Sequence, residues 1–282
     1  MWWILEAAAL AAIAFFALMR SRREDEPAGF LLRFSLVCAA SWLGEQTCIT
    51  LYRFYAYSPQ WHFFAGQVPL VVILAWPAVI LSGRDLAAQM LGKGHRLLPW
   101  AAAALVGSDA ALIEPVAVNA GLWGWNEPGI FGVPPIAILG WAFFALGCNL
   151  WLGKHGEGRV SFREGLALLT LPALLAHALL LAAWWGALRW VNLAIPSALA
   201  AGCAWAVSLT LVWLAAKTGA GRRLNPRVLW LRLPAALLVY ALLFLAAGAP
   251  PMLTSYALAF APPYLLILGQ CCLQPKKQYQ QE

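Results

Sequence analysis

The chain has few charged residues, and it lacks the patterns that mark common cofactor and metal sites. Asp, Glu, Lys and Arg make up 11% of its 282 residues, whereas a soluble globular protein has about 25%. Its four histidines show no HxxH or HxxxH spacing, its six cysteines show no CxxC spacing, and no GxGxxG sequence precedes a helix. The sequence therefore implies no metal site, no disulfide framework and no nucleotide cofactor.

Apolar residues take the place of the missing charge and amount to 62% of the chain. A helix that crosses about 30 Å of hydrocarbon needs roughly 20 apolar residues at 1.5 Å per residue. Segments of this length predict an all-α polytopic membrane bundle, a single transmembrane domain over 1–282 with about eight or nine spanning helices. The expected spans are 2–19, 34–51, 68–82, 97–115, 133–152, 165–185, 193–216, 229–249 and 252–270.

The positive charges are distributed as in the loops of a membrane protein. Fifteen of the 19 Lys and Arg residues lie in alternate predicted loops or in the C-terminal tail, and Arg84, Lys93 and Arg96 form one such loop group. Arg33 and Arg232 are expected at helix ends. By the positive-inside rule, the N-terminus is predicted outside and the C-terminus in the cytoplasm of a prokaryotic cytoplasmic membrane. The charges form no basic stripe, so the net charge of +7 does not indicate a nucleic-acid partner.

One block of sequence occurs twice, 65 positions apart, which predicts two related helical hairpins over about 34–82 and 97–152. The first copy contains Val68-Pro69, Ile73-Leu74 and Trp76, and the second contains Val133-Pro134, Ile138-Leu139 and Trp141. Upstream of each copy is an aromatic-x-aromatic step, Tyr55-Ala56-Tyr57 or Trp123-Gly124-Trp125. Each unit is therefore predicted to be a helix, an aromatic outer loop, and a second helix opened by proline, a residue that suits the first helical turn.

Carboxylates occur in the apolar spans that precede these aromatic steps: Glu45 in the first unit, and Asp109 and Glu114 in the second. A charge near the centre of a bilayer costs several kcal/mol, so an acid there is a candidate for function. A carboxyl group in a medium of low dielectric keeps its proton at neutral pH, which makes it a candidate general acid. The alternative, a structural hydrogen bond or ion pair between helices, remains open. Glu6 and Glu127 are expected to be solvated.

Asp109 and Glu114 are five residues apart, about 140° around an ideal helix, so a regular helix would not turn both toward one pocket. The residue before a proline is driven out of the helical region. We therefore expect the span to end at Glu114, before Pro115, and Glu114 to turn inward. His177 lies in the middle of a span and is expected to be a hydrogen-bonded core residue.

Aromatic side chains are abundant, and many of the 16 Trp residues fit the belts that membrane proteins place at the bilayer surface. Those beside the acids differ, because electron-rich ring faces stabilise a nearby cation. An acid next to such faces suits carbocation chemistry without a cofactor. The expected substrate-binding residues are Tyr55, Tyr57, Trp76, Asn119, Trp123, Trp125 and Trp141.

The stretch 109–141 resembles a signature of the bacterial and archaeal carotenoid biosynthesis membrane proteins, a family that includes hydratases acting on the ends of acyclic carotenoids. The pattern consists of an acid-Pro-Val step, Gly-x-Trp-x-Trp, Gly-Val-Pro and Gly-Trp. It appears here as Glu114-Pro115-Val116, Gly121-Leu122-Trp123-Gly124-Trp125, Gly132-Val133-Pro134 and Gly140-Trp141. The family usually has aspartate where this chain has Glu114.

The resemblance implies hydration of a terminal double bond of a carotenoid or related isoprenoid, with the lipid bilayer as the surrounding phase. Asp109 or Glu114 would protonate the alkene, and Glu45 would guide the water that adds. Two alternatives remain open. A membrane terpenoid or carotenoid cyclase would begin with the same protonation, and a lipid transporter or scaffold would also show repeats, broken helices and buried acids. The oligomeric state is unknown at this point.

Overall fold

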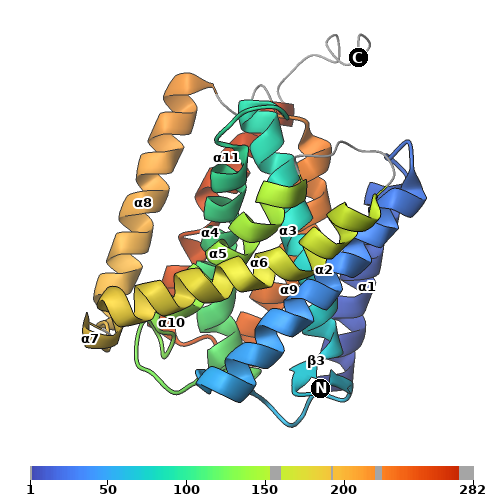
Figure 1. Ribbon diagram of the computed structural model, residues 1–282. Coiled ribbons are helices and arrows are strands. Elements are labelled where there is room, and N and C mark those ends of the chain that lie inside the picture. The colour runs from blue at the N-terminus through green and yellow to red at the C-terminus, as the bar shows by residue number, and fades with distance from the viewer. Residues whose placement is uncertain (1, 153–159, 192, 220–223, 273–282) are drawn as a thin grey trace.

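The computed structural model describes residues 2–152, 160–191, 193–219 and 224–272, which form a bundle of helices (Figure 1). In these ranges nine helical stretches are long and apolar enough to cross a membrane. This confirms the predicted helical class and the expected number of spans, and it marks the chain as an integral membrane protein. The orientation across the membrane stays a prediction.

The helices follow the apolar stretches closely, with ends that differ by several residues from the expected spans. They are α1 Trp2–Ser21, α2 Pro27–Thr47, α3 Leu70–Leu91, α4 Leu98–Asn119, α5 Pro135–Leu152, α6 Phe162–Ala183, α7 Arg189–Val191, α8 Ser197–Thr218, α9 Pro226–Leu245, α10 Pro251–Leu258 and α11 Ala261–Cys272. Two π-helical turns, η1 Cys48–Tyr52 and η2 Trp184–Leu188, extend α2 and α6. The ninth stretch is α10 followed by α11, and Pro262 and Pro263 lie in the first turn of α11, where proline is tolerated.

The central part of the bundle is formed by α2 to α6, which share the largest apolar core cluster. Its buried members include Val37, Ile80, Val106, Phe144 and Leu168, one from each of these five helices. Small residues let α5 and α6 approach closely, since a Cβ added at Gly147 would lie 2.8 Å from the Cα of Pro172. By contrast, α8 lies at the edge of the bundle against α10 and α11 (Figure 1).

Four short strands, which the sequence analysis did not predict, lie at the helix ends. β1 Tyr55–Tyr57 pairs with β4 Trp123–Trp125 in antiparallel fashion, with Ala56 opposite Gly124 at the centre. β2 Phe64–Ala65 and β3 Val68–Pro69 form a hairpin that leads into α3. The β1–β4 pairing joins the two aromatic steps that the repeated sequence placed 68 positions apart.

The expected end of a span at Glu114 is wrong, because α4 continues through Pro115 to Asn119. Proline removes the helical hydrogen bond to the carbonyl four residues earlier, which is that of Ala111. The Tyr256 hydroxyl on α10 donates to this Ala111 carbonyl at 2.7 Å. A neighbouring helix thus satisfies the freed backbone group, as membrane helices with internal proline require.

Three arginines expected in loops or at helix ends lie deeper within a helix than its first or last turn. Arg84 is inside α3, where its Nη1 donates to the Asn149 side chain at 3.2 Å. Arg33 lies in the second turn of α2, which begins earlier than expected, and its Nε is 3.5 Å from Glu164. Arg232 lies in the second turn of α9. Each of them contacts a polar side chain of another helix, which makes a position inside the bundle tolerable.

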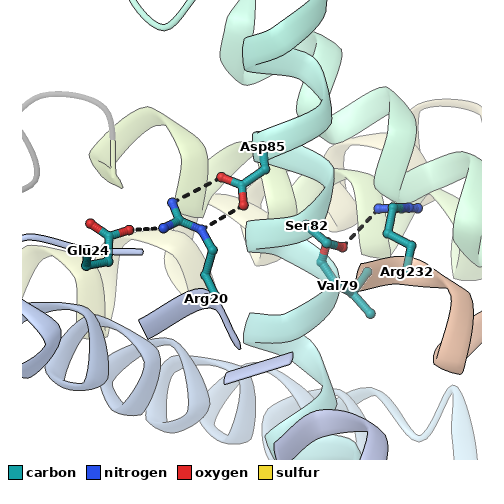
Figure 2. Close-up of polar contacts among 6 residues, drawn as sticks. All are labelled: Arg20, Glu24, Val79, Ser82, Asp85 and Arg232. Carbon is teal, nitrogen blue, oxygen red and sulfur yellow. Dashed lines mark hydrogen bonds and ion pairs between the residues drawn. The ribbon is translucent and has the colours of Figure 1, made fainter. Parts of the chain in front are cut away.

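Ionic contacts also join α1 to α3 near the end of α1. Arg20 donates to both carboxylate oxygens of Asp85, at 2.7 and 3.2 Å, and also pairs with Glu24 (Figure 2). These residues fix the end of α1 and do not line the central cavity described next.

Candidate active site

A cavity of about 490 Å³ lies inside the bundle and is lined by residues of α1 to α6, α9, α11, β1 and β4. Most of its wall is apolar. The charged side chains on the described part of this wall are Glu45, Asp109, Glu114 and Arg232. The structure therefore places all three predicted acids on one cavity, together with the six predicted Tyr and Trp residues.

Glu45, near the end of α2, accepts three hydrogen bonds from aromatic side chains. The hydroxyls of Tyr55 and Tyr57 both donate to its Oε2, the latter at 2.9 Å. Trp76 Nε1 donates to its Oε1 at 2.9 Å. The aromatic step on β1 thus provides two of these three hydrogen-bond donors, and α3 provides the third.

Glu114, near the end of α4, also accepts three hydrogen bonds, and each of its partners corresponds to one partner of Glu45. Trp123 Nε1 and Trp125 Nε1 donate to its Oε2 at 2.8 and 2.9 Å. Trp141 Nε1 donates to its Oε1 at 2.8 Å. In both cases one oxygen binds the aromatic-x-aromatic step, and the other binds the tryptophan of the following helix.

The local folding that produces this arrangement follows from strand geometry. Side chains two residues apart in a strand point to the same face, so each aromatic step directs two ring donors at one carboxylate. The antiparallel register then packs the two steps against each other: the Tyr55 and Trp125 rings are tilted, with centroids 4.5 Å apart, and the Tyr57 and Trp123 rings meet edge-on, with centroids 5.8 Å apart. A layer of aromatic rings therefore lies between the two acids.

The two phenols of β1 stay protonated in this environment. Burial raises the pKa of Tyr55 and of Tyr57 well above the usual value of 10, and the neighbouring Glu45 carboxylate raises it further. Their hydroxyls therefore remain available as hydrogen-bond donors at any physiological pH.

Asp109 has a different environment from the two glutamates. Arg232 Nη2 lies 2.5 and 2.6 Å from its two oxygens. Arg232 Nη1 also donates to Ser82 Oγ at 2.9 Å (Figure 2), and the guanidinium lies 6.0 Å from the Tyr264 ring centre. A carboxylate that binds a guanidinium through both oxygens has no proton to donate, so this geometry favours the structural ion pair that the sequence left open.

We expected Asp109 and Glu114 to share a pocket only if the helix ended at Glu114. This expectation is also wrong. Both side chains line the cavity from a continuous helix. They do so on different sides of α4, since Asp109 contacts Arg232 of α9 whereas Glu114 contacts Trp141 of α5.

Two other expected positions differ from their predictions. Asn119 does not line the cavity, and its Nδ2 donates to the carbonyls of Pro115 and Phe131, which ties the end of α4 to the following loop. Glu6 is 4% exposed rather than solvated, because it accepts a hydrogen bond from the His62 backbone at 2.6 Å and contacts the His62 ring at 3.0 Å. Glu127 is partly exposed in the loop after β4.

The prediction that His177, a residue of the cavity wall, is hydrogen bonded is also wrong. Both ring nitrogens of His177 are buried without a hydrogen-bond partner in the described part of the chain. Its position in the middle of an apolar span was the only signal for it. Arg232 was missed because it was expected at the end of a helix, whereas α9 begins six residues earlier, at Pro226.

The fold and the site together define an integral membrane protein with two aromatic-bound carboxylates on an apolar cavity. The sequence profile described as carotenoid biosynthesis protein matches residues 1–207. The chain therefore belongs to the carotenoid biosynthesis protein family, which confirms the resemblance seen in the sequence. No curated protein and no solved structure is significantly similar to it. The matched region holds both glutamates and all six of their aromatic donors.

Proposed function

We propose that this protein is a cofactor-free acid catalyst that adds water to a terminal double bond of an acyclic carotenoid or related isoprenoid. The observation that carries the proposal is the pair of carboxyl groups, Glu45 and Glu114, each bound by three aromatic donors on one apolar cavity. Membership of a carotenoid biosynthesis family supports the proposed substrate class. The matched partners also support the proposal that 34–82 and 97–152 are related units.

The cavity suits a hydrocarbon substrate that stays in the membrane. Its volume of about 490 Å³ lies within the usual range for small-molecule sites, about 300–1,000 Å³. Leu237 of α9 and Leu265 of α11 line it, and they are 60% and 64% exposed on the outside of the bundle. We infer that the end of a long isoprenoid enters from the lipid between these two helices.

Donor chemistry distinguishes the roles of the two glutamates. An indole N–H donates and never accepts, whereas a phenol hydroxyl does both. Trp123, Trp125 and Trp141 therefore hold Glu114 as an acceptor, and they offer no route for a proton. Around Glu45, the two phenols can exchange a proton with the carboxyl group.

Accessibility points the same way. Glu114 is 2% exposed, whereas Glu45 is partly accessible at the cavity wall. We assign Glu45 as the proton donor and Glu114 as the carboxylate that stabilises the cation. This assignment replaces the order that the sequence resemblance implied, in which Asp109 or Glu114 donates.

The proposed reaction returns every group to its starting state. The proton of the Glu45 carboxyl group bonds to the less substituted alkene carbon through the π electrons, leaving a tertiary cation at the other carbon. The rings of Trp76 and Trp141, whose centroids are 4.5 Å apart, and the Glu114 carboxylate stabilise that charge. A water oxygen then bonds to the cation, and its extra proton returns to Glu45. The net change is one alkene and one water converted to one tertiary alcohol.

Product mass tests the proposal in cells that make lycopene. Expression of the protein is expected to give a pigment heavier by one water, and the Glu45→Gln variant is expected to give none. The matched control is Glu24→Gln, which changes a carboxylate that pairs with Arg20 outside the cavity. A new pigment of unchanged mass would favour cyclisation. An unaltered profile across several acyclic isoprenoids, with the protein present in the membrane, would contradict both reactions.

A further inference from the structure

His177 lies in the middle of α6, and its side chain lines the same cavity as Glu45 and Glu114. Its ring packs edge-on against the Tyr52 ring, with centroids 5.5 Å apart and planes at 76°. Neither buried ring nitrogen reaches a hydrogen-bond partner among the residues that the structure describes. The imidazole is therefore held in place by packing, with both of its polar atoms unused.

This arrangement is unfavourable unless a ligand supplies the missing partner. A neutral imidazole has one N–H donor and one acceptor nitrogen, and burying either one unpaired costs free energy. The nearest lining residues along α6 are Ala176 and Leu180, which have no side-chain polar atom to offer. A group that both donates and accepts hydrogen bonds fits such a position, and the simplest such group is a hydroxyl.

The helices around His177 place it on the side of the cavity where Glu45 lies. α2 packs against α6, and the π-helical turn η1 begins three residues after Glu45 and carries Tyr52. The second π-helical turn, η2, follows α6 and presents Trp184 to Phe54, with ring centroids 5.3 Å apart. Such turns widen a helix locally and are frequent at functional sites.

We propose that His177 binds the hydroxyl group of an isoprenoid alcohol in the cavity. The proposal rests on the proposed function in one respect: this alcohol is taken to be the hydration product, and the same position is taken to hold the water that adds. Recognition of a hydroxyl by the imidazole is supported independently of the reaction, by the position of the ring on the cavity wall and by its two unpartnered nitrogens. In the reaction His177 is a positioning residue, because the proton transfers remain with Glu45.

Binding measurements test this site without any turnover. The purified protein in lipid nanodiscs is titrated with geranyllinalool, a tertiary isoprenoid alcohol, and with the matching hydrocarbon that carries hydrogen in place of the hydroxyl. Tryptophan fluorescence reports occupancy, since Trp76, Trp123, Trp125 and Trp141 line the cavity. One net hydrogen bond predicts that the alcohol binds about tenfold more tightly than the hydrocarbon.

Variants then assign the preference to the imidazole. His177→Leu is expected to reduce the ratio to about one, whereas His177→Gln, which keeps a donor and an acceptor, is expected to retain most of it. The control is His95→Leu, since His95 is exposed in the loop between α3 and α4. His177→Leu removes an unpaired polar group, so it is expected to fold, and its thermal transition checks this.

Two results would overturn the proposed site: wild-type protein with no preference for the alcohol, or a preference that survives in His177→Leu. Failure of the proposed reaction has a different signature. A protein that prefers the alcohol through His177 but never hydrates lycopene would retain the hydroxyl site and lose the assigned activity.

Discussion

Replacing each glutamate of the site by glutamine is expected to affect stability unequally, because the two side chains have different kinds of partner. Glutamine keeps one acceptor oxygen and gains an NH₂ group that only donates. At Glu45, that NH₂ can donate to a phenol oxygen, while the carbonyl accepts from Trp76. All hydrogen bonds can then be re-formed.

At Glu114 the same substitution cannot satisfy its neighbours, since all three donate and none accepts. The least costly orientation places the glutamine carbonyl where Oε2 accepts from Trp123 and Trp125, and turns the NH₂ toward Trp141 Nε1, now 2.8 Å from Oε1. At least one buried N–H loses its partner, which costs about 1–3 kcal/mol.

The assay is unfolding of the purified protein in detergent, followed by the thermal or denaturant midpoint. We expect Glu114→Gln to be less stable than Glu45→Gln by about 1–3 kcal/mol. Adding Trp141→Phe is expected to remove most of the excess, because no indole N–H then faces the NH₂, and a double-mutant cycle measures this coupling. Equal losses for the two glutamine variants, or no coupling between positions 114 and 141, would refute the reasoning.

Three further predictions concern the rest of the cavity. Asp109→Asn leaves Arg232 without its charge partner inside the bundle and is expected to cost about 3–5 kcal/mol in unfolding experiments, a loss that Arg232→Met should partly relieve in the double variant. Tyr55 and Tyr57 are expected to remain un-ionised through pH 10, because burial and the nearby Glu45 carboxylate hold the pKa of both well above that value; an ultraviolet pH titration in which Tyr55→Phe or Tyr57→Phe removes a phenolate signal with a midpoint near 10 would contradict it. In D₂O, His177→Leu is expected to lower the yield of alcohol while deuterium still enters the terminal alkene, since Glu45 still transfers a deuteron and the cation re-forms an alkene by losing a protium from a neighbouring carbon to Glu45; mass spectrometry of the recovered substrate distinguishes this from a loss of all exchange.

The sequence was informative wherever the signal was local or repeated. Apolar runs of about 20 residues indicated the helices. The two aromatic-x-aromatic steps indicated four ring side chains that do line the cavity, and the tryptophan of the repeated block indicated the other two, Trp76 and Trp141. Glu45 and Glu114 were found because a membrane acid is costly enough to be noticed. Their aromatic partners were found because the pattern occurs twice.

What the sequence did not reveal depends on contacts between distant segments. Arg232 and Asp109 are 123 positions apart, and Tyr256 is 145 positions from Ala111, whose carbonyl accepts the Tyr256 hydroxyl where Pro115 has removed the helical hydrogen bond. The three-residue strands β1 and β4 are too short to give an alternating pattern. His177 has no hydrogen-bond partner among the described residues because the side chains packed around it offer none. The sequence near His177 does not show which side chains those are.

Isotope labelling gives the most direct test of acid-catalysed hydration. Membranes containing the protein are incubated with lycopene in ¹⁸O-labelled water without molecular oxygen, and the product is analysed by mass spectrometry. The account predicts a tertiary alcohol that carries one labelled oxygen from water, and none with Glu45→Gln. An alcohol without the label, or one that requires molecular oxygen, would contradict protonation followed by capture of water.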